Sequence, residues 1–182
     1  AAKGWLYPTY PKEYGGGGLS GPQETVIQEE FHRARIVGSF ISDLVLGTLM
    51  VWGTEQQKQK FLVPLLKAET TAWQKFTEPQ SGADLANYQG TAVRDGDDWL
   101  LNGNKLWITN GKEADICLLF AHHDPSDRLR GISAFIIEGR WDGVEVLHRS
   151  RFMGIRAIEN GVIKFTVGQR RGLRHVLRHG AD

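Results

Sequence analysis

The chain has 182 residues, of which 41% are hydrophobic and 24% are charged, and its net charge is +1. These values are ordinary for a soluble globular protein with one domain or two small ones. No apolar run approaches the roughly 18 residues that would span a bilayer. Cys117 is the only cysteine, so no internal disulfide can form and a reducing compartment is favoured.

The charge is unevenly spread along the chain. The last 14 residues carry a local charge of +3, which leaves −2 for the remainder. A body with that balance lacks the electrostatic footprint of a nucleic-acid-binding protein. No metal ligand is assigned either, because the adjacent His122 and His123 would point to opposite faces of a strand.

Residues 1 to about 20 are expected to be irregular. Pro8, Pro11 and the run Gly15–Gly18 oppose a stable helix. The glycine run does not follow a predicted strand, so we interpret it as a flexible turn rather than a dinucleotide-binding loop.

Three helices are predicted between residues 20 and 72. Capping boxes at Ser20–Gln23 and Thr54–Gln57 open the first and the third. Gly53 is expected to end the second helix, and Pro64 to kink or break the third. Apolar residues at helical spacing form broad stripes on the first two helices: Ile27, Phe31 and Ala34, then Val37, Ile41, Leu44, Val45, Leu49 and Trp52.

From about residue 73 the hydrophobic period changes to that of strands. YQGTAVRDGDDWLLNG is interpreted as two strands joined by an Asp-Gly turn, with Asn102-Gly103 and Asn110-Gly111 as further turns around a short strand. ICLLFAHH, ISAFIIE, VEVLHR and VIKFTV continue the series. The fold class predicted is therefore α+β: an N-terminal helical segment followed by an antiparallel β-barrel or sandwich.

Two loops, FTEPQSGADL and KLWITNG, carry the candidate chemistry. In the first, Pro79 fixes one φ angle and Gly82 frees another, which is typical of a loop whose backbone something approaches, and not of an ordinary hairpin turn. Thr77 and Thr109 offer hydroxyls, and Trp107 is expected on the same strand face as Thr109. These groups suit a flat heteroaromatic ligand, although from the residues alone a core tryptophan with two turn-capping threonines is the simpler interpretation.

The stretch from Phe76 to Gly111 resembles the middle-domain signature of the flavin-dependent acyl-CoA dehydrogenases. That signature runs Thr-Glu-Pro, a small-residue stretch ending in Gly-Ser-Asp, and then Asn-Gly-x-Lys-x-Trp-Ile-Thr-Asn. GWLYPTYPKEYGGGGLS and MGIRAIENGVIKF are similar to two further segments of that family. The resemblance implies an incomplete N-terminal helical domain at 1–72, a flavin-binding middle β domain at 73–168 and an atypical basic tail at 169–182.

The resemblance also implies a site for FAD. Thr77 is expected to hydrogen-bond the flavin pyrimidine edge, Thr109 to reach flavin N5, and Trp107 to pack against the ring and screen it from water. Donors aimed at the pyrimidine edge favour the negative charge of reduced flavin. The implied cofactor-binding set is Gln74, Phe76, Thr77, Trp107, Ile108 and Thr109. No catalytic residue is assigned in this chain, and Glu78 is interpreted as a residue that shapes its loop.

Two departures from the family pattern stand out. Ala83, at an implied substrate-binding position, replaces a serine whose hydroxyl can bond acyl-CoA or the flavin phosphates, at a cost of about 1 kcal/mol. Ser81 is the alternative donor nearby. The resemblance also implies a C-terminal helical bundle that supplies the catalytic glutamate and most oligomer contacts, and we expect it to lie outside these 182 residues. The tail arginines, Arg170, Arg171, Arg174 and Arg178, are interpreted as a frayed end of an interrupted chain, with a basic helix for an acidic partner as the alternative.

The intact parent is accordingly expected to oxidise an acyl-CoA to its 2-enoyl-CoA, passing the β-hydride to flavin and then electrons to an electron-transfer flavoprotein. A homo-oligomer in the bacterial cytoplasm or the mitochondrial matrix is implied, with no nucleic acid and no membrane span. The chain by itself is expected to bind FAD weakly and to be inactive. An acyl-CoA oxidase or flavin monooxygenase on the same scaffold, and a non-catalytic binding module, remain as alternatives.

Overall fold

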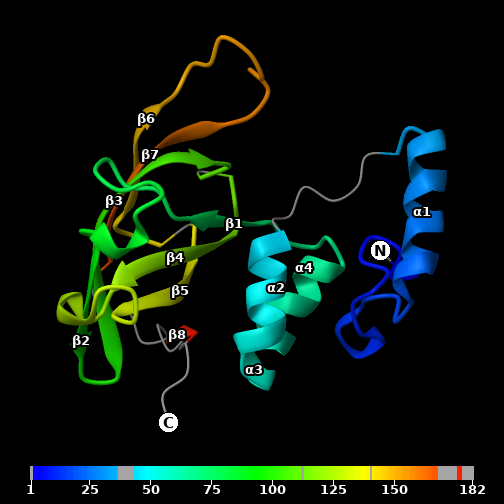
Figure 1. Ribbon diagram of the computed structural model, residues 1–182, viewed down its shortest axis with the longest axis horizontal. Helices are drawn as coiled ribbons and strands as arrows, with labels where there is room; N and C mark the ends of the chain where they lie inside the picture. The colour runs from blue at the N-terminus through cyan, green and yellow to red at the C-terminus, as the bar shows by residue number, and fades with distance from the viewer. Residues whose placement is uncertain (1, 37–42, 112, 140, 168–175, 178–182) are drawn as a thin grey trace. The chain divides into compact units, whose positions relative to one another are not determined.

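The computed structural model describes residues 2–36, 43–111, 113–139, 141–167 and 176–177. The chain divides into two compact units, Ala1–Thr71 and Ala72–Asp182. Within the described residues, the first unit contains helices and the second a sheet (Figure 1). The predicted α+β class is therefore confirmed.

Helices of the first unit begin where the sequence places their caps. Ser20 N–H donates to Gln23 Oε1 at 2.9 Å. Thr54 N–H donates to Gln57 Oε1 at 2.9 Å, and Gln57 N–H returns a bond to Thr54 Oγ1 at 3.2 Å. Both capping boxes form as predicted. The helices are η1 (Lys12–Tyr14), α1 (Gly21–Arg33), α2 (Asp43–Trp52), α3 (Glu55–Gln57), η2 (Lys58–Leu62) and α4 (Val63–Leu66).

The predicted end of the second helix is present. α2 ends at Trp52, directly before Gly53. The third predicted helix continues without interruption from α3 through the π-helical turn η2 into α4, so Pro64, in the first turn of α4, does not break it. Proline has no N–H to donate, and Pro64 lies just after the π-helical turn, where the α-helical hydrogen-bond pattern is already interrupted.

The apolar stripes are only partly buried within this unit. Val45, Leu46 and Leu49 of α2 are buried, whereas α1 has no buried residue. Val37 and Ile41, two residues of the predicted second stripe, lie outside the described residues.

The glycine run packs against the chain that precedes it. Gly16 N–H donates to Pro11 O at 3.0 Å, and Gly17 N–H to Tyr7 O at 3.2 Å. A Cβ on Gly16 would lie 2.2 Å from Tyr10 O. The run therefore allows a close backbone contact, and Gly15 and Gly18 adopt the positive φ angles that a turn requires.

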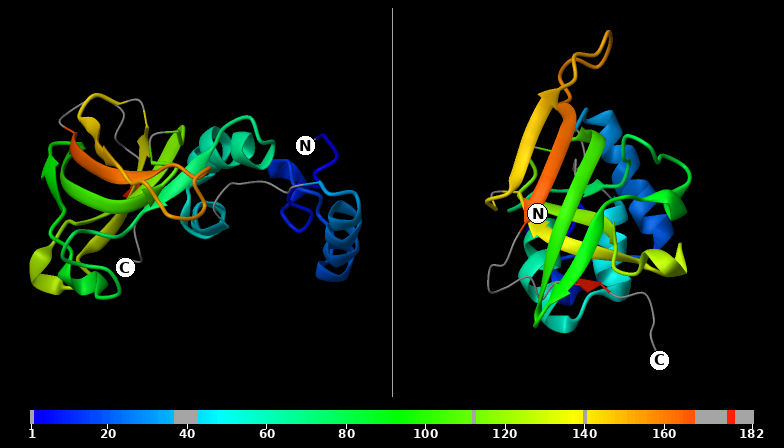
Figure 2. Two further views of the ribbon diagram at one scale, coloured as in Figure 1. Left: turned by 90° about the horizontal axis from the view of Figure 1, so that it is seen from above. Right: turned by 90° about the vertical axis from the view of Figure 1, so that its left-hand side faces the viewer.

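The second unit is an eight-stranded sheet in the order β6-β7-β3-β2-β4-β5-β8, with β1 paired to β4. The sheet curls, so that β4 and β5 cross behind β2, β3 and β7 in the right-hand view of Figure 2. Most pairs are antiparallel, but β1–β4 and the single β2–β4 bridge are parallel, which makes the sheet mixed. The strands are β1 (Ala72–Lys75), β2 (Thr91–Asp95), β3 (Asp98–Thr109), β4 (Ile116–His122), β5 (Ile132–Glu138), β6 (Val144–Arg149), β7 (Asn160–Val167) and β8 (Val176–Leu177).

Asn102-Gly103 is not the turn that we predicted. β3 runs through it unbroken, and Gly103 pairs with Phe165 of β7. A Cβ at Gly103 would lie 2.7 Å from Phe165 Cζ and 2.8 Å from Gly90 Cα. This glycine therefore permits close packing inside the sheet. The Asp-Gly turn does form, with Gly96 at φ 61° between β2 and β3.

The sheet encloses an apolar core that includes Cys117, Leu119, Phe135 and Phe165. Cys117 is fully buried, as expected for a core residue. Val176–Leu177 of the basic tail pairs with β5, while the arginine stripe lies outside the described residues.

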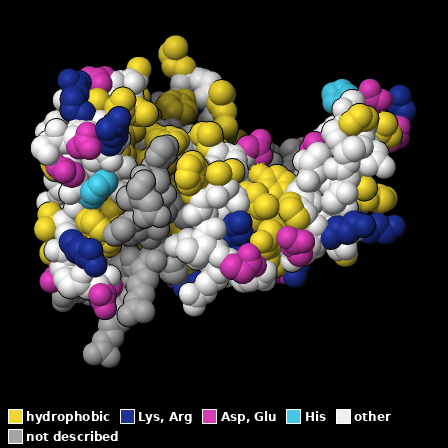
Figure 3. Space-filling model, turned by 60° about the horizontal axis from the view of Figure 1, so that its bottom comes forward, with side chains coloured by type: hydrophobic (Ala, Val, Ile, Leu, Met, Phe, Trp, Pro, Cys, Tyr) yellow, Lys and Arg dark blue, Asp and Glu magenta, His cyan; other side chains and the backbone are white. Residues whose placement is uncertain are grey.

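Surface charge and helix length give two further constraints. On the face drawn in Figure 3, acidic and basic side chains of the sheet unit are interspersed rather than gathered by sign. Within the described part of the chain, no helix has the length and apolar character needed to cross a bilayer.

Candidate functional site

The two loops singled out in the sequence are tied to each other by buried lysines. Lys105 of β3 donates from Nζ to the Phe76 carbonyl at 3.0 Å. Lys75, the last residue of β1, donates from Nζ to the Gly111 carbonyl at 3.0 Å. Both lysines are 0% exposed. Each loop therefore fixes the backbone of the other.

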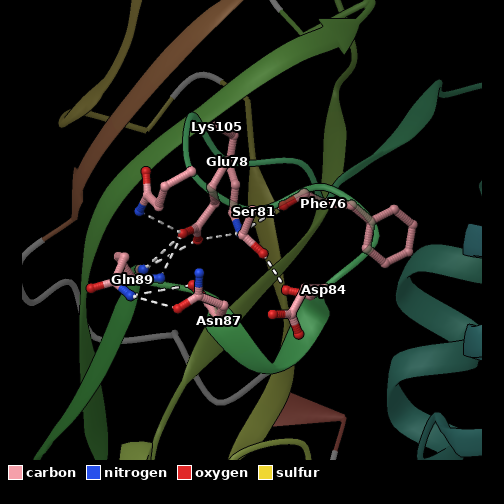
Figure 4. A network of polar contacts seen from close by, with 9 residues as sticks. Phe76, Glu78, Ser81, Asp84, Asn87, Gln89 and Lys105 are labelled. Carbon is pink, nitrogen blue, oxygen red and sulfur yellow. Dashed lines mark hydrogen bonds and ion pairs between the residues drawn. The ribbon is translucent and has the colours of Figure 1, made fainter.

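A buried carboxylate completes this junction (Figure 4). Glu78 Oε1 lies 2.8 Å from Lys105 Nζ. Glu78 also accepts from the backbone N–H of Gln89 at 2.6 Å and of Gly90 at 3.1 Å. The ring of Tyr88 lies 4.0 Å from the same ammonium. With this many donors Glu78 is a fixed anchor for the loop, which agrees with the shaping role predicted for it.

Burial dominates the electrostatics of this cluster. Desolvation lowers the pKa of Lys105 to about 8, against the opposing effect of the Glu78 contact. Desolvation, with a smaller contribution from the Glu78 charge, raises the pKa of Tyr88 above its ordinary range. These side chains are therefore buried in the low-dielectric interior of the protein. In such surroundings ionic interactions are strong and unpaired charges are costly.

The segment after Thr77 does form a tight turn, contrary to our expectation. Glu78 N–H donates to Ser81 O at 2.8 Å, and Ser81 N–H donates to Glu78 O at 3.2 Å. Pro79 occupies the second position of this turn, which its fixed φ favours. Ser81 is buried and its hydroxyl donates to the Asp84 carbonyl. It therefore does not replace the hydroxyl that is missing at Ala83.

The loop opens beyond this turn. A Cβ on Gly82 would meet no atom within 4 Å, and Gly82 is not among the glycines with positive φ. Ala83 beside it is exposed. Gly82 therefore does not adopt a backbone conformation that requires glycine. The space beside its backbone is unobstructed.

Trp107 lies in a β-bulge. The register of β3 against β7 shifts between Lys105 and Ile108, and Trp107 has φ 54°. The bulge interrupts the alternation of side chains along β3, from which we predicted Trp107 on the same strand face as Thr109. The indole is 63% exposed, so Trp107 is not a core residue. Leu106 N–H donates to Thr77 O at 2.7 Å, which brings the first loop against the bulge.

The other residues of the predicted set differ in what they expose. The carboxamide oxygen of Gln74 is buried without a hydrogen-bond partner among the described residues. Phe76 stacks on Phe120 with ring centroids 4.3 Å apart. Ile108 is 3% exposed, so its side chain packs in the core. Thr109 is half-buried.

Sequence reasoning missed three residues that organise the site: Lys75, Lys105 and Asn160. Lys105 follows Leu101 and Gly103 at the strand period, a pattern that could have placed it on the inward face. Asn160 donates to Trp107 O and Thr109 Oγ1, and nothing local in the sequence indicates it. Within the described residues, no group of three or more His, Cys, Asp or Glu could hold a metal ion.

The fold and the loops define a class of protein: a helical unit followed by a curled sheet whose two tied loops present hydroxyls and an exposed indole. Residues 1–69 match the model of the acyl-CoA dehydrogenase N-terminal domain, and residues 74–167 match that of the middle domain. The chain therefore belongs to the acyl-CoA dehydrogenase family.

Individual relatives agree with this assignment. A short-chain-specific acyl-CoA dehydrogenase of Clostridium acetobutylicum is 38% identical over 81% of this chain and 40% of its own length. Butyryl-CoA dehydrogenase of Megasphaera elsdenii superposes with a TM-score of 0.83 at 31% identity, covering 97% of this chain and 48% of that one. The prolyl acyl carrier protein oxidase AnaB superposes with a TM-score of 0.80 at 28% identity, over 97% and 48%. The chain thus spans two-fifths to one-half of these relatives.

The residues present fit a flavin. Its pyrimidine edge offers hydrogen-bond donors and acceptors side by side, which calls for both kinds of group in the protein. Thr77 and Thr109 supply hydroxyls, and Gln74 supplies a buried acceptor that lacks a partner among the described residues. The exposed indole of Trp107 supplies a flat apolar surface.

Proposed function

We propose that residues 73–168 form a flavin-binding domain and that this chain provides the flavin side of an acyl-CoA dehydrogenase site, with residues 1–72 as its helical domain. When bound, FAD supplies the acceptor for the hydride that leaves the acyl chain. One observation carries the proposal: the 2.7 Å bond from Leu106 N–H to Thr77 O, which joins the Thr-Glu-Pro loop to the bulge of Trp107.

The residue roles follow from what each group offers. Thr77 and Gln74 hold the pyrimidine edge, Thr109 places its hydroxyl at N5, and Trp107 covers the ring and excludes water. Phe76 and Ile108 contribute through their backbone, because one is stacked on Phe120 and the other is packed in the core. Donors fixed in advance at the ring edge stabilise the charge that appears on reduction without a cost of reorganisation.

The substrate class is an acyl-CoA thioester that loses an α-proton and a β-hydride to become the 2-enoyl-CoA. The α-proton is weakly acidic, so a base and the hydride acceptor must hold the substrate between them. We assign no base within these 182 residues and place Ala83 toward the substrate. We expect these residues by themselves to bind FAD weakly and to form no enoyl-CoA.

The partners follow from the same assignment. An electron-transfer flavoprotein would take the electrons onward, and the enzyme would assemble as a homo-oligomer, with residues 169–182 as an atypical basic tail. Relatives from Clostridium acetobutylicum and from mouse mitochondria support a location in the bacterial cytoplasm or the mitochondrial matrix.

FAD titration tests the proposal directly. Thr77→Val and Thr109→Val keep the shape of each side chain but remove the hydroxyl, and each should weaken FAD binding about fivefold to tenfold. Thr166→Val is the matched control, because Thr166 is an exposed threonine of β7 in the same sheet. Equal FAD affinities in all four chains would refute the site.

An oxidase is the second candidate, and the similarity to AnaB favours it. The two activities differ in the final electron acceptor, which is another flavoprotein for a dehydrogenase and oxygen for an oxidase. The test mixes the intact parent protein with acyl-CoA in air. Formation of one hydrogen peroxide per acyl-CoA oxidised would identify an oxidase. Reduction of an added electron-transfer flavoprotein without peroxide would identify a dehydrogenase.

A further inference from the structure

Asn160 contacts both the bulge and the second threonine, although it is in none of the predicted roles. It is the first residue of β7 and pairs with Thr109, the last residue of β3. Its Nδ2 donates to Trp107 O at 2.9 Å and to Thr109 Oγ1 at 3.3 Å. The residue is 7% exposed, so these contacts are shielded from water.

The backbone around Asn160 is fixed on both sides. Ser150 N–H donates to Asn160 O at 2.8 Å, and Asn110 N–H donates to Glu159 O at 2.8 Å. A short carboxamide on a fixed backbone has few rotamers, so the position of its nitrogen is determined by the sheet.

Chemistry determines which end of the carboxamide faces the bulge. The carbonyl of Trp107 can only accept, so it requires the nitrogen of Asn160 and excludes the oxygen. The second hydrogen of that nitrogen then reaches Thr109 Oγ1. Asn160 Oδ1 is buried with no partner among the described residues, so no competing contact favours the reverse orientation.

Two consequences follow for the site. Trp107 has φ 54°, a left-handed conformation that is unfavourable for a residue with a side chain, and the bond to its carbonyl helps to hold it there. Because Thr109 Oγ1 accepts a hydrogen from Asn160, the hydroxyl proton of Thr109 must be directed elsewhere. The threonine is thereby prepared as a donor.

We propose that Asn160 is a positioning residue of the flavin site, which holds the Trp107 bulge and directs the Thr109 hydroxyl proton toward the flavin. The inference rests on the proposed function, since the flavin is what receives that proton in a hydrogen bond. It adds a residue that acts on the cofactor through two others, Thr109 and Trp107.

The first test needs no ligand and no variant. In the isotope-labelled chain, the side-chain NH₂ of Asn160 should exchange with solvent at least about tenfold more slowly than that of Asn104, which is exposed on β3. Equal exchange rates for the two carboxamides would overturn the inference, whatever the chain does with FAD.

The second test uses FAD with Asn160→Asp, Thr109→Val and the double variant. The carboxylate of Asn160→Asp cannot donate, so we expect about tenfold weaker FAD binding and a shifted visible absorption maximum of the bound flavin. Thr109→Val already removes the hydroxyl that Asn160 directs, so the two losses of FAD affinity should not add in full in the double variant, and any loss beyond that of Thr109→Val reports the support that Asn160 gives to the Trp107 bulge. Asn104→Asp is the charge-matched control and should change neither readout.

The outcomes separate the two claims. If Thr109→Val weakens binding while Asn160→Asp leaves the affinity and the bound spectrum unchanged, the role of Asn160 is overturned and the flavin site stands. If Asn160→Asp lowers the affinity but leaves the spectrum of the bound flavin unshifted, Asn160 only stabilises the fold and the inference fails. If the unaltered chain binds no FAD at any concentration, the proposed function is wrong. The positioning role of Asn160 is then wrong as well, even when the exchange test shows a protected carboxamide.

Discussion

The ammonium of Lys105 and the carboxylate of Glu78 lie 2.8 Å apart, and their side chains are 0% and 1% exposed. The chain also has an exposed pair of similar length, Arg149 and Glu159, at 2.6 Å with 62% and 25% exposure. The buried pair joins the Thr-Glu-Pro loop to β3, whereas the exposed one lies beside solvent. Removing one partner of the buried pair would leave a charge without compensation, which water cannot offset.

Replacing the buried lysine should therefore be costly. We expect Lys105→Met to lower the free energy of unfolding by about 3 kcal/mol, measured by urea denaturation of the purified chain. Arg149→Met is the control for loss of a paired cation at the surface and should cost less than about 1 kcal/mol. Adding Glu78→Gln to Lys105→Met should restore part of the loss, because the orphan charge is then gone. Equal losses for the two single variants would contradict the buried-pair argument.

The same lysine gives the chain a predictable pH dependence. Its pKa in the folded chain is about 8, below its ordinary 10.5, chiefly because of desolvation. Between about pH 8 and about pH 10.4 the unfolded chain binds this proton and the folded chain does not, so the contribution of Lys105 to stability rises with pH there and is lost as pH falls through the folded pKa. The Cε resonance of Lys105 should titrate near pH 8 in a carbon NMR experiment. Titration near the ordinary lysine pKa would show that the Glu78 contact outweighs desolvation.

Adding a methyl group at Gly90 should lower the free energy of unfolding, whereas adding one at Gly82, in the Thr-Glu-Pro loop, should not. A Cβ on Gly90 would lie 2.8 Å from Glu78 Oε1, whereas one on Gly82 would meet nothing within 4 Å. Gly90→Ala should therefore displace the carboxylate and cost about 1–3 kcal/mol of unfolding free energy. Gly82→Ala is the matched control, and should leave stability unchanged or raise it by up to about 1 kcal/mol. A tolerated Gly90→Ala would mean that Glu78 is not held as described.

Trp107 allows a test that separates binding from folding. Its indole is 63% exposed, so Trp107→Leu should change the unfolding free energy by less than about 1 kcal/mol. If the indole covers the flavin, the same change should weaken FAD binding about tenfold, because the flat contact surface is lost. Trp5→Leu removes an indole of 45% exposure from the helical unit and serves as the control for fluorescence titrations. An unchanged affinity in Trp107→Leu would remove this residue from the site.

Features specified by adjacent residues could be predicted from the sequence. The capping boxes at Ser20 and Thr54, the helix end at Gly53 and the Asp-Gly turn at Gly96 all depend on residues within four positions. Their chemistry is complete in the local sequence, so no knowledge of the rest of the fold is required.

Features set by distant residues could not be predicted in the same way. The Asn-Gly pair at Gly103 predicts a turn locally, but this position requires glycine because Phe165 of β7 and Gly90, which directly precedes β2, approach it closely. The bulge at Trp107 likewise depends on the register between β3 and β7. The two threonines and the indole stand out from the chemistry of their loops, whereas the contacts that organise them come from Lys105 and Asn160. The strand period indicates an inward face for Lys105 but not its partners, and nothing local indicates Asn160.

Replacing Ala83 by serine is expected to strengthen ligand binding. The residue is exposed beside the open backbone of Gly82, and the hydroxyl of Ser81 is already used by Asp84. A serine at position 83 should therefore add a donor that the loop lacks, and Ala83→Ser should tighten binding of FAD or coenzyme A about fivefold, equivalent to about 1 kcal/mol. Ala83→Cys, assayed under reducing conditions, is the control for added volume, because a thiol is a weak donor. A gain for only one ligand identifies what Ala83 faces, and no gain for either would remove position 83 from the binding surface.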